Sequence, residues 1–147
     1  MTGKSKIYTF LTSTDIDKIL KLWQTAGLSY RPKGRDTKAN ILKQMQKEST
    51  QFMGIIQNDE LIAVAIASHN GRKGWVNRLA VHSDHRRMGI ASQLIRYCEE
   101  WLADEGIEII AVLIESDNPD SLALFDNNDY TRHDDIIYFT KKKYPGV

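Results

Sequence analysis

The sequence predicts an α/β fold for a single domain over residues 1–147, in which about four helices flank a mostly antiparallel sheet. Two turn signals, Asn58-Asp59 and Asn70-Gly71-Arg72-Lys73-Gly74, separate three runs of strand-forming residues. Connections this short join antiparallel neighbours. Apolar residues recur at helical intervals between residues 90 and 102, and a continuous apolar run follows from Ile107 to Ile114. The 147 residues are the length of one ordinary domain and contain no repeat, linker or low-complexity tract.

The N-terminal third predicts one strand and two helices. Ile7–Leu11 has the composition and alternation of a strand. Thr12-Ser13-Thr14 offers N-caps for a helix that stops near Gly27, with Trp23 on its buried face. A loop at Arg31–Arg35 leads to a more polar helix over residues 37–47.

The remaining two thirds predict a meander of strands followed by alternating elements. The expected strands are 51–57, 61–68, 75–81, 107–114 (covered on both faces) and a final pair near Tyr130 and over 136–142. The expected helices run from about residue 90 to a stop at Gly106, and from about 119 to 127.

Charge and cysteine content exclude several classes of protein. Lys and Arg number 20 against 19 Asp and Glu, so no overall charge favours nucleic acid or a membrane surface. No apolar run approaches the roughly 18 to 20 residues that span a bilayer. Cys98 is the only cysteine, which excludes an internal disulfide and a cysteine-based metal site. We therefore expect a cytoplasmic protein with no metal, no membrane contact and no nucleic-acid partner.

The segment Leu79–Ala91 predicts an anion site. It places a strand, the basic pair Arg86-Arg87 and the flexible Gly89 directly before a strong amphipathic helix. The first turn of a helix exposes unpaired N–H groups and carries partial positive charge, so a phosphate or pyrophosphate would fit there. Taken alone, such a string is also compatible with a solvated basic loop.

The same residues carry a family resemblance. Arg86-Arg87-Met88-Gly89-Ile90-Ala91 matches the Q/R-x-x-G-x-G/A motif of the GCN5-related N-acetyltransferase (GNAT) family. Leu79-Ala80-Val81 resembles the family's L-x-V segment, and Asn118 with the following helix resembles its N-x-x-[AS]-x-x-L-Y element. The order of predicted elements is also that of the family, over nearly the whole chain.

The resemblance implies a binding site for acetyl-coenzyme A (acetyl-CoA) and no metal. The backbone of Leu79, Ala80 and Val81 would pair with the pantetheine arm, Asn118 would hydrogen-bond it, and the two central strands would splay apart between Val81 and Glu115. The residues implied around the pyrophosphate are Arg86, Arg87, Met88, Gly89, Ile90, Ala91 and Ser92. Leu79 and Val81 are equally compatible with a core, and Asn118-Pro119 with a simple helix start.

The sequence departs from the family where catalysis needs acids and bases. Phe125 occupies the position of the usual tyrosine acid, and the common base positions hold Trp75, Asn77 and Leu113. Asn77 can order a water, and Glu115 is the best-placed carboxylate for water-mediated base catalysis. The simpler interpretation of Glu115 is a solvent-exposed carboxylate at the end of its strand, with no catalytic role.

Alternatives remain open for the acid. Either a tyrosine from elsewhere in the chain, Tyr130 or Tyr138, replaces the missing acid, or the thiolate leaves without an acid, or the protein is a poor catalyst. Cys98 on the apolar face of its helix is expected to be packing, and His82 and His85 to be loop residues.

We therefore expect an acetyl-CoA-dependent N-acetyltransferase that acylates a primary amine, on a protein N-terminus or a small molecule, by direct attack in a ternary complex. The acidic C-terminal third would suit a cationic amine. An acyl-CoA-binding regulatory module with little turnover is the alternative, and a nucleotide enzyme is disfavoured because both nucleotide-binding glycine motifs are missing. Many relatives are homodimers, but the sequence itself leaves the oligomeric state open.

Overall fold

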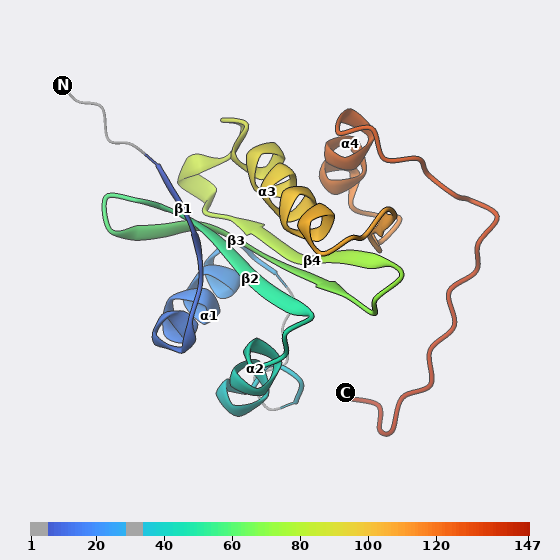
Figure 1. Cartoon of the computed structure of the whole chain (residues 1–147), viewed down its shortest axis with the longest axis horizontal. Coiled ribbons are helices and arrows are strands. Elements are labelled where there is room, and N and C mark those ends of the chain that lie inside the picture. Colours follow the sequence, from blue (N-terminus) through green and yellow to red (C-terminus); the bar gives the residue numbers. More distant parts are fainter. Residues whose placement is uncertain (1–5, 29–33) are drawn as a thin grey trace.

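Five strands form one sheet in the order β1-β2-β3-β4-β5 in the computed structural model, which describes residues 6–28 and 34–147 (Figure 1). The strands are β1 (Ile7–Phe10), β2 (Thr50–Gln57), β3 (Glu60–His69), β4 (Gly74–Val81) and β5 (Ile110–Ala111). The first four pair antiparallel in succession, and β5 pairs parallel with β4. The predicted antiparallel meander is thus confirmed, because two-residue and four-residue turns permit only this pairing.

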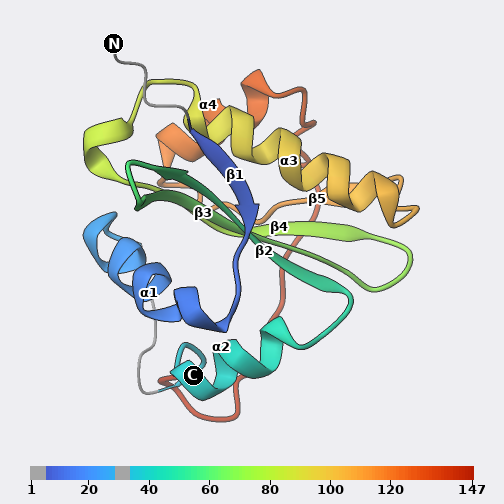
Figure 2. The same ribbon diagram turned by 60° about the vertical axis from the view of Figure 1, so that its left-hand side comes forward.

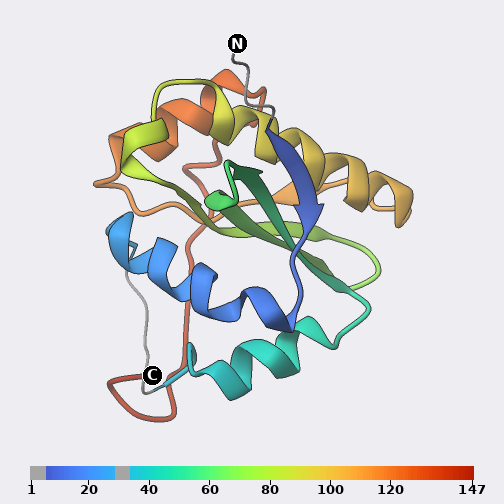
Figure 3. The ribbon, with the colours of Figure 1, turned by 90° about the vertical axis from the view of Figure 1, so that its left-hand side faces the viewer.

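Four α-helices lie in the described part of the chain, two on each face of the sheet (Figures 2 and 3). They are α1 (Ile16–Thr25), α2 (Lys38–Met45), α3 (Ile90–Asp104) and α4 (Pro119–Asn127), with 3₁₀ turns η1 (Ser13–Asp15) and η2 (Ser83–His85). Helices α1 and α2 cover one face, and α3 and α4 lie on the other (Figure 3). The predicted α/β fold class is confirmed.

Two apolar cores explain why β3 is almost wholly apolar. Ile62 and Ala65 point into the core beneath α3, whereas Val64 and Ile66 point into the core beneath α1 and α2. A strand covered on both faces has no side that could be polar. Trp23 of α1 is fully buried in the second of these cores, as its helical spacing predicted.

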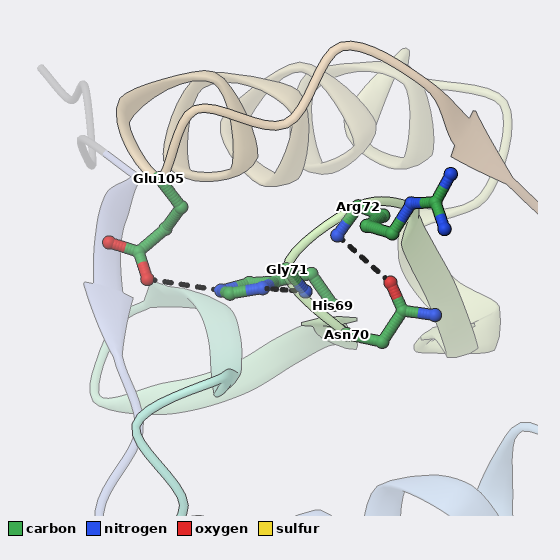
Figure 4. Close-up of polar contacts among 5 residues, drawn as sticks. All are labelled: His69, Asn70, Gly71, Arg72 and Glu105. Carbon is green, nitrogen blue, oxygen red and sulfur yellow. Dashed lines mark hydrogen bonds and ion pairs between the residues drawn. The ribbon is translucent and has the colours of Figure 1, made fainter.

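The turn between β3 and β4 is tied to the end of α3 through His69 (Figure 4). The backbone N–H of Gly71 donates to His69 Nδ1 at 3.0 Å, so Nε2 is the nitrogen that donates to Glu105 Oε1, at 3.1 Å. Asn70 Oδ1 accepts from the N–H of Arg72 at 3.0 Å. The contact between His69 and Glu105 therefore holds the β3–β4 turn to α3, the helix that covers this face of the sheet.

A β-bulge disturbs the pairing of β3 with β4. Val64 lies opposite Ala80 but Ile66 lies opposite Asn77, so two residues of β4, Arg78 and Leu79, face one residue of β3. Arg78 has a φ of 57°, in the left-handed region that side chains rarely adopt. A bulge adds local bend and twist to its strand, and here it lies where β4 begins to leave β5.

Two predictions about the C-terminal half are wrong. The segment 107–114 is paired for only two residues, and Ile109 and Leu113 are exposed instead of covered. The final strands near Tyr130 and over 136–142 are absent from the described structure, in which every residue from 131 to 140 is exposed and belongs to no helix or strand. A strand needs a hydrogen-bonding partner, which local sequence composition does not supply.

Candidate functional site

The parting of β4 and β5 opens a cleft. The two strands pair only at Gly74–Ile110 and Trp75–Ala111, and separate beyond these residues. The space is about 740 Å³. Its walls on the sheet side are Val76, Asn77, Arg78 and Leu79 from β4, and Val112, Leu113, Ile114 and Glu115 from the chain after β5. The splayed central strands that the resemblance implied are thus present.

The end of the cleft nearest α1 carries a charged pair over an aromatic ring. Arg78 Nη2 donates to Asp36 Oδ2 at 3.1 Å, and the guanidinium lies 4.5 Å from the centroid of the Trp23 ring. Burial lowers the pKa of Arg78 from its ordinary value, while Asp36 opposes that shift. Arg78 reaches Asp36 from the bulge of β4, where its backbone is left-handed.

Helix α4 closes another side of the cleft. Asn118 is its N-cap, and Asn118 Oδ1 accepts from the N–H of Ser121 at 3.1 Å. The side-chain amide N–H groups of Asn118 donate no hydrogen bond in the described part of the chain, so they are available to a ligand. Phe125 is buried with its ring edge-to-face against Tyr130, the centroids 5.0 Å apart, and it also lines the cleft.

The start of α3 has the form of an anion site. Gly89 is the N-cap with a φ of 74°, and no side chain caps this end of the helix. A Cβ placed on Gly89 would meet no atom within 4 Å, so the backbone here is open to a ligand. Arg87 also adopts a positive φ, of 63°. The unpaired first amides of the helix and its dipole both favour a negative group.

The two basic residues before this helix behave differently. Arg86 Nη2 donates to the carbonyl oxygen of Ala26 at 2.9 Å, so this guanidinium ties the loop to the end of α1. Arg87 and Met88 are exposed. Of the implied anion-binding residues, Arg87 therefore carries the available side-chain charge, and Arg86 has a structural contact of its own.

The predicted residues form two groups that β4 connects. Asn77, Leu79, Glu115, Asn118 and Phe125 line the cleft. The residues from Arg86 to Ser92 lie outside its lining, at the start of α3, where β4 leads through Val81 and η2.

Two further observations describe the space between these two groups of predicted residues. Asn128, at the end of α4, donates to Ser92 Oγ at 3.0 Å. Ala80 is buried in the core, so only its backbone can face a ligand. An elongated ligand could therefore run from the start of α3 along β4 into the cleft.

Comparison with known proteins identifies the family. The sequence profile of the acetyltransferase (GNAT) family matches residues 16–130. The chain belongs to this family. An acetyltransferase of the bacterium Sodalis glossinidius, SG1711, is 24% identical over 128 residues, which are 87% of this chain and 89% of that one.

Solved structures share the fold at low sequence identity. Aminoglycoside N-acetyltransferase AAC(6')-Iy in complex with CoA has a TM-score of 0.78 at 17% identity, over 96% of this chain and 97% of that one. The ribosomal-protein-alanine N-acetyltransferase of Brucella melitensis has a TM-score of 0.72 at 19% identity, over 94% and 99%. The expected class, an acyltransferase that uses acetyl-CoA, is confirmed.

Neither tyrosine considered as a replacement acid lines the cleft of this GNAT protein. Tyr130 Oη donates to Glu99 Oε2 of α3 at 2.8 Å, and burial together with this bond raises the pKa of Tyr130. Tyr138 lies in the exposed C-terminal segment. Phe125 cannot donate a proton, so the lining offers no tyrosine acid among the described residues.

The cysteine and the two histidines agree with their simpler interpretations. Cys98 lies on the buried face of α3, and burial raises the pKa of its thiol to about 12. His82 Nδ1 accepts from the N–H of Asp84 at 3.1 Å, and His85 Nε2 lies 4.0 Å from Glu60 Oε1. All three are away from the cleft lining.

Five polar residues of the cleft lining were missed by the sequence analysis, one of them Ser121 of α4. Arg35, Asp36 and Gln44 come from the loop before α2 and from α2 itself, and Arg78 comes from β4. A charged residue inside the strand-forming run 75–81 was the one signal for Arg78. Nothing in the sequence indicated its contact with Asp36, 42 residues earlier.

Residues 6–28 and 34–147 contain neither a metal-binding cluster nor a membrane-spanning helix. No three His, Cys, Asp or Glu side chains gather there in a way that could hold a metal ion. None of the helices in these ranges has the length and apolar character needed to cross a membrane.

Proposed function

We propose that this GNAT protein acetylates a primary amine, on a small molecule or a protein N-terminus, by direct attack of the amine in a ternary complex. The observation that carries the proposal is the cleft between the parted strands β4 and β5, together with the uncapped start of α3, to which β4 leads through η2. One end of this path suits a pyrophosphate, and the other has room for an acceptor.

The donor half of the path is assigned to backbone groups and one side chain. Amides from Arg87 to Ser92 at the start of α3 would hold the pyrophosphate, with the positive φ of Gly89 allowing close approach. The backbone of Leu79–Val81 would pair with the pantetheine arm, and the free amide of Asn118 would hydrogen-bond it. Acetyl-CoA supplies an activated acetyl group as a thioester when it is bound.

The acceptor half must hold an amine in its neutral form next to that group. Asn77 of β4 and Glu115 of the chain after β5 both line the cleft, and both are exposed to solvent. We assign Glu115 as the base that accepts the amine proton, through a water that Asn77 helps to order. Since an aligned neutral amine attacks a thioester readily, positioning supplies most of the rate and no covalent enzyme intermediate is needed.

The acceptor is proposed to be a cationic amine. Glu115 and Asp117 are exposed carboxylates at the cleft, and Asp36 is the counter-ion of Arg78. Two structural neighbours are named for an aminoglycoside and for a ribosomal-protein alanine. Aminoglycosides and protein N-termini both carry a primary amine that is protonated at neutral pH.

A thermal melt with and without acetyl-CoA, with ATP as the comparison ligand, tests the donor site. At about 100 times its dissociation constant, a ligand specific to the folded state adds roughly 2.7 kcal/mol. For a domain of this size that raises the melting temperature by about 5 to 10 °C. We expect that shift with acetyl-CoA and none with ATP.

Release of free CoA with a panel of amines then tests the transfer step. The panel needs an aminoglycoside, a linear polyamine and a peptide with a free N-terminal alanine. Steady release with one class supports the enzyme. A clear melt shift with no release from any class would instead support a CoA-binding regulatory module, the function that the absence of a tyrosine at Phe125 favours. No shift would remove the donor assignment.

A further inference from the structure

The cleft lining contains charged side chains of both signs, and the proposed transfer step uses only part of them. The charged residues are Arg35, Asp36, Arg78, Glu115 and Asp117. Carboxylates suit a cationic amine, and Glu115 is assigned as its base, but neither arginine has a role in the transfer. Two positive charges in a cleft that takes a cationic amine therefore need a reason of their own.

The two arginines lie together, at the end of the cleft formed by α1 and the loop before α2. Arg78 Nη2 donates to Asp36 Oδ2 at 3.1 Å, and its guanidinium lies over the ring of Trp23. Burial lowers the pKa of Arg78 most, Asp36 raises it, and the charge of Arg35 lowers it again. The two guanidinium groups are therefore close enough to repel each other.

Arg35 has no counter-ion of its own. It is exposed, and it makes no hydrogen bond or ion pair within the described part of the chain. The loop that carries it is fixed, because Asn40 Nδ2 donates to the carbonyl oxygen of Gly34 at 2.9 Å and Thr37 caps α2. The two arginines against the single carboxylate of Asp36 leave this end of the cleft with one positive charge in excess.

The opposite charge gathers where the chain enters α4. Glu115 and Asp117 are exposed, and neither is in an ion pair within residues 6–28 and 34–147. Helices α1 and α2 cover one face of the sheet and α4 lies on the other (Figure 3), so these carboxylates and the two arginines belong to different walls of the cleft. One wall is therefore positive and the other negative.

We infer that the acceptor carries a carboxylate in addition to its primary amine, and that Arg35 binds this carboxylate while the amine faces Glu115. The inference rests on the proposed function, since it names the substrate class of the same transfer. A guanidinium presents paired N–H donors that match the two oxygens of a carboxylate. Amino acids, with the amine at the α carbon or farther along the chain, are the molecules that carry both groups.

The charge of the arginine wall favours a carboxylate over other groups. A carboxylate carries one negative charge at neutral pH, which matches the one positive charge in excess. A phosphate monoester carries about −1.5 to −2. A polycation would bring further positive charges against Arg35 and Arg78, and like charges in a binding site repel. The cleft volume of about 740 Å³ is ordinary for a small-molecule site, for which about 300–1,000 Å³ is usual.

The carboxylate takes no part in the transfer itself. The amine nitrogen forms a bond to the acetyl carbon, and the carbon–sulfur bond of the thioester breaks. The ammonium form of the acceptor gives up two protons in all, one to solvent through Glu115 and one to the departing sulfur. The product is an N-acetylated amino acid, which keeps its carboxylate but has lost the positive charge that Glu115 and Asp117 attract.

Matched pairs of acceptors test the inference. L-Alanine, γ-aminobutyrate and ε-aminocaproate, in which the amine and the carboxylate are progressively farther apart, are each compared with their own carboxamide by release of free CoA. We expect kcat/KM to be at least about tenfold higher for the carboxylate at one spacing, the factor that a hydrogen bond to a charged group supplies. Equal values within every pair, or a preference for phosphoethanolamine over every carboxylate, would overturn the inference.

Variants of Arg35 attribute the preference to one guanidinium. Arg35 is exposed, so Arg35→Gln should fold, and the preference within the pair should fall to near unity. Arg35→Glu should reverse it in favour of the carboxamide. Arg72→Gln, at an exposed arginine in the β3–β4 turn outside the cleft, is the matched control and should keep the full preference. A preference that survives Arg35→Gln contradicts the assignment.

Binding to the CoA-loaded protein separates this inference from the proposed function. CoA lacks the acetyl group, so NMR titration gives the dissociation constant of each acceptor without transfer. A preference for carboxylates that depends on Arg35, with no release of CoA in the assay, would support the inference and contradict the transferase. Acetylation of carboxylates and carboxamides alike would do the reverse. Binding of no carboxylate at all would also overturn the inference.

Discussion

Arg78 Nη2 donates to Asp36 Oδ2 at 3.1 Å across 42 residues of sequence, while its guanidinium covers the ring of Trp23. The contact joins the bulge of β4 to the loop before α2, at one end of the cleft. Both residues of the pair line the cleft. The pair sits where a change should affect substrate binding and stability together.

Asp36→Asn should weaken both substrate binding and the stability of the fold. The amide keeps the shape but not the charge, so a partly buried guanidinium loses its counter-ion, and a hydrogen bond between charged groups contributes about 1.5 to 3 kcal/mol. We expect a loss of about 1 to 2 kcal/mol in urea unfolding and a higher KM for the amine. Asp17→Asn removes the exposed Asp17–Lys38 pair and should change neither quantity. Equal effects of the two variants would show that the Asp36–Arg78 pair contributes no more than an exposed ion pair does.

Gly89→Val should abolish the melt shift with acetyl-CoA. A β-branched side chain at a φ of 74° strains the backbone, and its methyl groups would occupy the open space in front of the first amides of α3. Gly71→Val is the matched control, because Gly71 has a φ of 86° and equally open surroundings but lies in the β3–β4 turn. It should lose similar stability and keep the shift. A shift that persists in Gly89→Val would overturn the anion-site assignment.

Glu115→Gln should lower kcat/KM for the amine by about 10- to 100-fold at neutral pH, since a positioned general base contributes about 10²- to 10⁴-fold. The affinity for acetyl-CoA, measured by calorimetry, should stay unchanged. Glu108→Gln, an exposed carboxylate outside the cleft, should retain full activity. If Glu115→Gln is also fully active, another group removes the amine proton.

Phe125→Tyr should raise kcat. The ring of Phe125 lines the cleft, and a hydroxyl there restores the acid that the family's pattern has at this position. Protonation of the departing thiolate should then speed turnover by about tenfold or more, measured as release of free CoA. Phe125→Leu keeps the position apolar and should give no gain. An unchanged kcat in Phe125→Tyr would show that departure of the thiolate does not limit the rate.

The buried thiol of Cys98 predicts a loss of stability in alkali. Its pKa is raised from 9.0 to about 12 by burial, so above pH 9 the unfolded chain releases a proton that the folded chain retains. The free energy of unfolding must then fall as pH rises between 9 and 12. Tyr8, whose pKa burial raises from 10.0 to about 12, adds to the fall above pH 10.

Cys98→Ala removes the contribution of the thiol. Urea unfolding at pH 7.5, 9 and 10.5 should show the variant destabilised by about 1 kcal/mol at pH 7.5 because of the lost buried group. The difference from the unmodified chain should shrink as pH rises, and the contribution of Tyr8 should remain in both. Parallel pH curves would mean that the thiol ionises alike in the folded and unfolded chains.

Local sequence patterns were sufficient for most of the fold. The predicted bounds of α4 agree with the structure at both ends, because Asn118-Pro119 is a strong start signal and the cap forms within three residues. Gly89 before an amphipathic run marked the start of α3 for the same reason. The antiparallel meander followed from two short turns, whose geometry leaves no other pairing.

Long-range pairing is where the predictions failed. The run 107–114 and the segment 136–142 have the composition of strands, but a strand exists only where another strand supplies hydrogen bonds. In this structure β4 leaves β5 after two pairs, and no strand of residues 6–28 or 34–147 accompanies residues 136–142. Composition reports which residues suit a strand, and only the tertiary structure reports which edge is available.

The sequence by itself determined the family and the order of the elements up to α4, because both depend on residues close together in the chain. Only the tertiary structure decided that β4 and β5 part to form a cleft, that Arg78 contacts Asp36, and that Tyr130 Oη is bonded to Glu99. These features depend on contacts between residues up to 42 positions apart. Such contacts are set by how the layers pack, and periodicity within one element carries no information about them.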